Sequence, residues 1–229
     1  MPRYCAGFVL LALSVLPVSA SAQDPAPVVQ PVAAEPIARY VLDARGTMAR
    51  FKPLASIGTS LGVDANTTLP TRGFGVMVGA HLYPLRRGSF ALGVGGEWLL
   101  PTQGSRTAAA ATEDGPEGPT VETRIGGLSP QVSLNFGRRK GYSYISGGVG
   151  WASLTSEREQ TTTSPVTSPD DDRRRAMNYG GGARWFAKKH LAFSLDLRFY
   201  AVSAREATAT VPEYPSMTVM VFSAGVSIR

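Results

Sequence analysis

Apolar residues recur at every second position through long segments of the chain after residue 38. The pattern is clearest between Leu191 and Tyr200, where Leu and Phe at odd positions alternate with Ala, Ser, Asp, Arg and Tyr. A period of two is typical of β-strands whose two faces meet different surroundings. The pattern predicts eight strands, at about residues 39–50, 73–85, 89–100, 121–137, 142–156, 176–187, 191–204 and 216–229.

The first strand has two possible positions. Residues 39–50 alternate clearly, with Asp43 and Arg45 on the polar face, whereas residues 54–62 alternate only weakly. Pro53 and the turn-forming residues after position 62 favour a loop there. We place the first strand at 39–50 and keep 54–62 as the alternative.

Short turns and long polar loops alternate between the predicted strands. The short turns are Arg86–Gly88, Arg138–Gly141 and Lys188–His190, and the long loops are 51–72, 101–120, 157–175 and 205–215. An even number of strands with this alternation is typical of membrane barrels, and strands of 9–11 residues are long enough to cross a bilayer. The sequence therefore predicts an all-β fold: an eight-stranded antiparallel up-and-down transmembrane β-barrel with short periplasmic turns and longer extracellular loops.

The first residues carry the features of a secretory signal peptide. A positive start at Arg3 is followed by an apolar run from Cys5 to Val18, and Ala20-Ser21-Ala22 fits the cleavage pattern. Cys5, the only cysteine, would leave with this peptide. The expected organisation is a signal peptide at 1–22, a proline-rich linker at 23–38 and the barrel domain at 39–229.

The same alternation would also suit a soluble, lipocalin-like periplasmic carrier with a polar outer face. Charged residues make up only 17% of the chain, below the roughly 25% of ordinary soluble domains. The polar face carries few charges and many glycines, which suits a crowded barrel interior better than a surface in water. The membrane barrel is the favoured interpretation.

The chain resembles the small eight-stranded outer-membrane β-barrel family, the OmpA-like and OmpX-like barrel domains of Gram-negative bacteria. The resemblance is carried by the signal peptide, the run Asn178–Phe186, its partner Leu191–Tyr200 and the final strand Val221–Arg229. It implies residence in the cell outer membrane and a structural or surface-interaction role through the long loops. It also implies lipopolysaccharide, phospholipid and the outer-membrane assembly machinery as partners. The chain departs from the family pattern by ending in Ile228-Arg229, where an aromatic residue is common.

Several charged residues fall on the face predicted to line the lumen. Because a buried charge must be paired, we expect them to neutralise one another in an interior ion network. The alternative is a gate or narrow path for ions or apolar solutes. These residues are Asp43, Arg45, Glu97, Arg184, Asp196 and Arg198.

All three predicted short turns are basic. In a chain with a net charge of +6, such turns on one rim would meet anionic headgroups of the inner leaflet. The residues expected to make these lipid contacts are Arg86, Arg87, Arg138, Arg139, Lys140, Lys188 and Lys189.

The sequence offers no candidate catalytic, cofactor or metal site. His81 and His190 are the only histidines, and neither is expected near an outer loop, where a histidine-based lipid enzyme would need one. We therefore expect a protein that is not an enzyme and has no cofactor. Because the chain is exported, nucleic acid is not an expected partner, whereas an extracellular partner could bind the loops.

Overall fold

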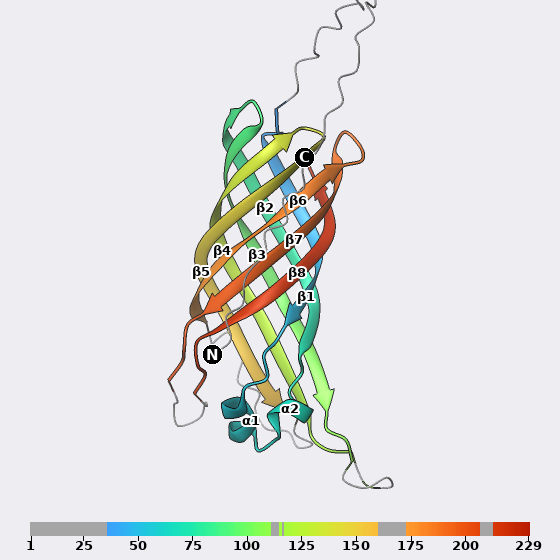
Figure 1. The fold of residues 1–229 in the computed structure, drawn as a ribbon, viewed down its shortest axis with the longest axis vertical. Helices are drawn as coiled ribbons and strands as arrows, with labels where there is room; N and C mark the ends of the chain where they lie inside the picture. Colours follow the sequence, from blue (N-terminus) through green and yellow to red (C-terminus); the bar gives the residue numbers. More distant parts are fainter. Residues whose placement is uncertain (1–35, 111–114, 116, 160–172, 207–212) are drawn as a thin grey trace, which may run out of the picture. The chain divides into compact units, whose positions relative to one another are not determined.

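The computed structural model describes residues 36–110, 115, 117–159, 173–206 and 213–229. Each strand pairs antiparallel with the next, and the first pairs with the last, so the sheet closes into an up-and-down barrel (Figure 1). Two short helices, α1 (Ala55–Leu61) and α2 (Ala65–Thr68), lie between the first two strands. The strands are β1 (Tyr40–Arg50), β2 (Arg72–Arg87), β3 (Phe90–Thr107), β4 (Thr120–Arg138), β5 (Gly141–Arg158), β6 (Arg174–Phe186), β7 (Leu191–Val202) and β8 (Met217–Ile228).

The predicted fold class, an eight-stranded antiparallel up-and-down β-barrel, is confirmed. The first strand lies at 40–50, and the alternative at 54–62 is wrong because α1 forms there. Strands β3, β4 and β5 run further than predicted, so the loop expected at 101–120 is shorter. The predicted signal peptide and the linker up to residue 35 lie outside the described residues.

The outer surface of the barrel is apolar. Outward side chains such as Phe74, Leu82 and Val149 are 61–70% exposed. Soluble monomers rarely expose a continuous apolar surface of this extent, whereas a barrel in lipid presents one. The strands therefore cross a membrane. The lipocalin-like alternative disagrees with this arrangement, because it would turn the face of Phe193 and Leu197 inward, and both are exposed.

The two ends of the barrel differ. The short β2–β3, β4–β5 and β6–β7 connections lie together at one end, here called the turn end (Figure 1). Helices α1 and α2 lie at the opposite end, here called the loop end. Within the described residues, the loop end therefore carries both helices, whereas the turn end carries the short connections between strands. No helix in the described part of the chain is long and apolar enough to span a membrane.

The barrel interior is packed in layers. All eight strands contribute to an apolar layer toward the loop end, here called the loop-end layer. It consists of Ala49, Phe51, Met77, Leu99, Ile125, Ala152, Leu154, Ala176, Tyr200, Val202, Val219 and Val221. A second apolar cluster near the turns, the turn-end layer, consists of Ile37, Val41, Tyr83, Ala91 and Tyr142. Buried charged side chains lie between these two layers.

Helices α1 and α2 pack against the inner face of the wall at the loop end. Ile57 and Leu69 are buried there against Val121 of β4 and against Tyr214. The two helices approach so closely that a Cβ atom added at Gly58 would lie 2.9 Å from the Cβ atom of Ala65. Gly62, with φ of 65°, ends α1 in the left-handed conformation that glycine adopts without strain. We call the segment 54–69 the cap.

Asp64 begins α2. Its carboxylate accepts hydrogen bonds from the backbone N–H groups of Asn66 (2.8 Å) and Thr67 (3.0 Å). These bonds favour the ionised form and lower the pKa of Asp64 below its ordinary value. The charge of Asp64 therefore helps to hold the cap in its helical conformation.

Candidate functional site

The buried charges come from four strands and meet in the middle of the lumen. β1 supplies Asp43 and Arg45, and β7 supplies Asp196 and Arg198, because residues two apart on a strand share a face. Glu97 and Arg184 complete the set from β3 and β6. We call these six residues the lumen network. All six are at most 5% exposed.

One half of the lumen network is centred on Asp43. Arg184 donates from Nε to one carboxylate oxygen of Asp43 (3.0 Å) and from Nη2 to the other (2.6 Å). The hydroxyl of Ser227 donates to the same carboxylate at 2.5 Å. The guanidinium of Arg184 also lies 4.2 Å from the ring centroid of Tyr144. Such a two-pronged pair fixes orientation as well as charge.

The other half is centred on Arg198. Its Nε atom lies 2.6 Å from Glu97 and 2.9 Å from Asp196, and its Nη1 atom donates to Gln131 at 2.7 Å. Asp196 also accepts the hydroxyl hydrogen of Tyr144 at 2.5 Å. Tyr144 fits beside β6 because Gly182 has no side chain: a Cβ atom there would lie 2.7 Å from the tyrosine oxygen.

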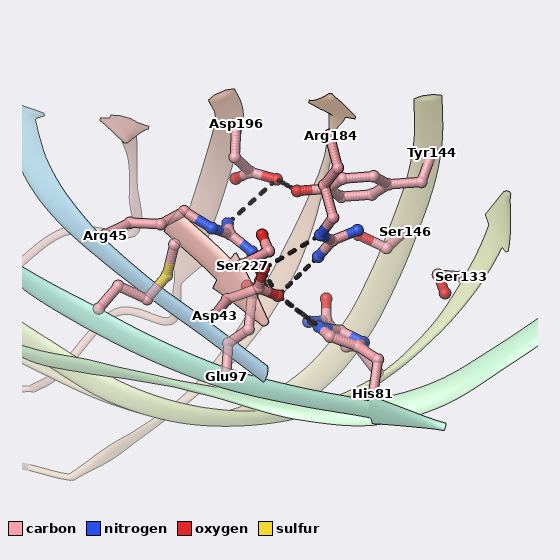
Figure 2. Close-up of polar contacts among 12 residues, drawn as sticks. Asp43, Arg45, His81, Glu97, Ser133, Tyr144, Ser146, Arg184, Asp196 and Ser227 are labelled. Carbon is pink, nitrogen blue, oxygen red and sulfur yellow. Dashed lines mark hydrogen bonds and ion pairs between the residues drawn. The ribbon is translucent and has the colours of Figure 1, made fainter. Parts of the chain in front are cut away.

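Arg45 joins the two halves. Its Nη2 atom lies 2.9 Å from Asp43 and 3.3 Å from Glu97, and its Nη1 atom lies 3.6 Å from Asp196 (Figure 2). The three arginines and three carboxylates balance formally. Since an unpaired buried charge is strongly unfavourable, this balance explains how six charged groups can be buried together.

His81 also lies in this cluster, although sequence reasoning did not assign it there. Its Nε2 atom is 3.7 Å from Glu97 and 3.9 Å from Asp43. The alternation of β2 places His81 on the inner face, but only the register between strands shows that it reaches these carboxylates. Gln131, Tyr144 and Ser227 escaped prediction for the same reason.

Asp43, His81 and Glu97 have the donor types of a metal site, with ligand atoms within 4.8 Å of one another. The positive charge among them is already supplied by Arg45, which contacts both carboxylates. A divalent ion would add two charges to a cluster that is already balanced. The residues therefore fit an ion-pair network better than a metal centre.

The lumen network lies between closed apolar layers. On the turn-end side, Ile37 is 1% exposed, and the hydroxyl groups of Tyr83 and Tyr142 lie 3.2 Å apart across the lumen. On the other side, the loop-end layer draws a side chain from every strand. Charged groups paired in this way stabilise and orient the wall.

The basic residues predicted at the short turns all lie at the turn end. Arg86 donates to the backbone oxygen of Ile37 at 3.1 Å and so holds the segment before β1. Arg229 donates to the backbone oxygens of Lys189, at 2.9 Å, and of Arg139, and its guanidinium lies 3.6 Å from the ring centroid of Phe186. The turn end thus combines basic side chains with bonds that tie its turns together.

Comparison with known proteins gives similarity of structure only. No protein-family model matches the sequence, and no curated protein is significantly similar to it. Neisserial surface protein A is 11% identical, with a TM-score of 0.45, covering 83% of this chain and 97% of that protein. OprG from Pseudomonas aeruginosa is 7% identical, with a TM-score of 0.44, covering 86% and 97%. Ail of Yersinia pestis, in complex with the heparin analogue sucrose octasulfate, is 10% identical, with a TM-score of 0.41, covering 82% and 96%. Similarity at this level shows neither a shared function nor a shared site.

Proposed function

We propose that this chain is an outer-membrane β-barrel with a structural or surface-interaction role, performed by its surfaces and loops and not by its lumen. The observation that carries the proposal is the closed interior: a balanced ion network enclosed between two packed apolar layers. Such a core stabilises the barrel but offers no passage. Membrane integrity, adhesion and recognition are the roles that remain open to a barrel of this kind.

In this proposal the turn end faces the periplasm and the loop end faces outward. Residues 1–22 act as the signal peptide, and the assembly machinery inserts the barrel. The basic side chains of the short turns contact anionic phospholipid headgroups of the inner leaflet. An extracellular partner would bind the connections at 51–72, 101–120, 157–175 and 205–215. The role is not enzymatic and requires no cofactor.

Cell fractionation combined with gel migration tests the location and the closed barrel. The tagged chain should be recovered in the outer-membrane fraction, and the unheated sample should run faster than the heated one. Recovery in the soluble periplasmic fraction would contradict the proposal.

Planar-bilayer recording tests the closed lumen. The purified barrel should show no conductance steps, whereas a general porin inserted under the same conditions provides the positive control. Reproducible steps that change when Arg184 or Asp196 is replaced would instead favour a channel through the lumen network.

A further inference from the structure

Two arginines lie side by side on the outer surface at the loop end. Arg50 is the last residue of β1 and Arg72 is the first residue of β2, and the two are direct cross-strand partners. Both side chains are exposed. They lie on the outward face of their strands, in line with the half-buried Met48 and the exposed Phe74.

Like charges placed directly opposite each other destabilise a pair of strands. Within the described residues, no acidic side chain forms an ion pair with Arg50 or Arg72. The contrast is Arg124, another partly exposed arginine near the loop end, which donates two hydrogen bonds of 2.8 Å to the carboxylate of Glu122. The Arg50–Arg72 pair therefore lacks the internal anion that Arg124 has.

The position of the pair indicates what could supply this anion. The next outward residues toward the turn end, Met48 and Phe74, belong to the apolar outer surface of the barrel, and Phe74 is 66% exposed. Arg50 and Arg72 consequently lie where the hydrocarbon ends and lipid headgroups begin. Guanidinium groups present planar sets of donors that match phosphate oxygens.

We propose that Arg50 and Arg72 together bind a phosphate group of an anionic lipid in the leaflet around the loop end. This inference rests on the proposed function, because that orientation makes the leaflet the outer one and the lipid a phosphorylated glycolipid. The phosphate relieves the repulsion between the two arginines and holds the lipid against the loop-end residues of the β1–β2 pair.

Titration of the refolded full chain with bisphosphorylated lipid A in nonionic micelles tests the proposal. The double variant Arg50→Gln/Arg72→Gln should bind about 25-fold more weakly than the wild type, since each arginine near the surface contributes about fivefold. The matched control Arg124→Gln should bind like the wild type, because Arg124 is already paired. Gel migration before and after heating verifies that each variant is folded.

A second variant distinguishes lipid binding at the Arg50–Arg72 pair from binding through the overall surface charge. Arg72→Glu should let Arg50 form an ion pair within the protein, so it should abolish lipid A binding while leaving the lipid-free barrel at least as stable as the wild type. Dephosphorylated lipid A should bind weakly to all variants, and millimolar inorganic phosphate should not displace lipid A.

Three outcomes would overturn the inference. They are wild-type binding by the double variant, an equal loss in Arg124→Gln, and displacement by inorganic phosphate, which would indicate a free-anion site. None of these outcomes depends on cellular location or conductance, so failure of the lipid site and failure of the proposed function are distinguishable.

Discussion

At the scale of single residues, Arg45 has an unusual position, because one guanidinium contacts carboxylates from three strands. It lies within 3.6 Å of Asp43, Glu97 and Asp196. Its removal would leave three carboxylates to two arginines, all at most 5% exposed, in the barrel interior. The charges of the lumen network are therefore coupled, so removing one changes the electrostatic energy of the remaining five.

The substitution Arg45→Met tests this coupling. It should lower the free energy of unfolding by about 3–5 kcal/mol, the range for breaking a buried ion pair from one side. Urea unfolding in lipid vesicles, followed by gel migration, measures the change. Arg45→Lys keeps the charge and should recover part of the loss. Equal stability of Arg45→Met and the wild type would mean that the carboxylates tolerate an unbalanced interior.

At the scale of elements, the cap depends on the close contact between α1 and α2. A Cβ atom at Gly58 would lie 2.9 Å from Ala65 and from the backbone oxygen of Val63, and neither can move without bending the cap. Gly58→Ala should therefore destabilise the cap by about 1–3 kcal/mol, the usual range for overpacking. Limited proteolysis of the folded protein should show faster cleavage near residues 54–69.

The exposed neighbour Thr59 supplies the control for that experiment. Thr59→Ala leaves the α1–α2 contact intact and should be cleaved at the wild-type rate. The barrel of both variants should keep its heat-dependent gel shift, because the strands do not depend on the cap for their pairing. Loss of the barrel in Gly58→Ala would instead show that the cap is part of the folding core.

The pH dependence of the cap follows from Asp64. Bonds from Thr67 and Asn66 lower the pKa of this carboxyl, so the ionised form stabilises the cap at neutral pH. That contribution is complete above the ordinary pKa of Asp64 and is lost as the pH falls through the lowered value. Proteolysis of the cap should accelerate in that acidic range. Asp64→Asn retains a capping side chain without a titrating group and should lack this acceleration.

The elements also show what could be predicted from the sequence. Alternation alone located the strands and placed Asp43 and Arg184 inside, because a strand has only two faces. Alternation could not predict the register between strands, so the contact of His81 with Glu97 could not be predicted from the sequence. The cap was missed because α1 has only seven residues and its N-cap residue, Leu54, makes no side-chain capping hydrogen bond. The extension of β3 over residues 101–107 was missed because this segment is polar and contains Pro101 and Gly104, not alternating apolar residues.

At the scale of the whole molecule, the barrel buries an ion network in its interior and presents a largely apolar outer wall. A protein that folds in water has the opposite arrangement, so the distribution itself defines the solvent for which the chain is built. The buried lumen network and the apolar outer wall both follow from the alternation of inward and outward side chains along the eight strands. Substitution of a single outward residue tests whether this face contacts lipid.

Val132 is suited to the test because it lies midway along the outward face of β4 and is 59% exposed. If lipid surrounds it, Val132→Arg should lower the free energy of unfolding in vesicles by about 2–4 kcal/mol, as expected for a basic residue near the bilayer midplane. If water surrounded it, replacing an exposed valine by arginine would have little effect. The matched substitution Ser105→Arg, at an exposed position in the extension of β3, should change folding by less than about 1 kcal/mol. Urea titration in vesicles measures both variants, and equal effects at the two positions would contradict a lipid-facing belt around β4.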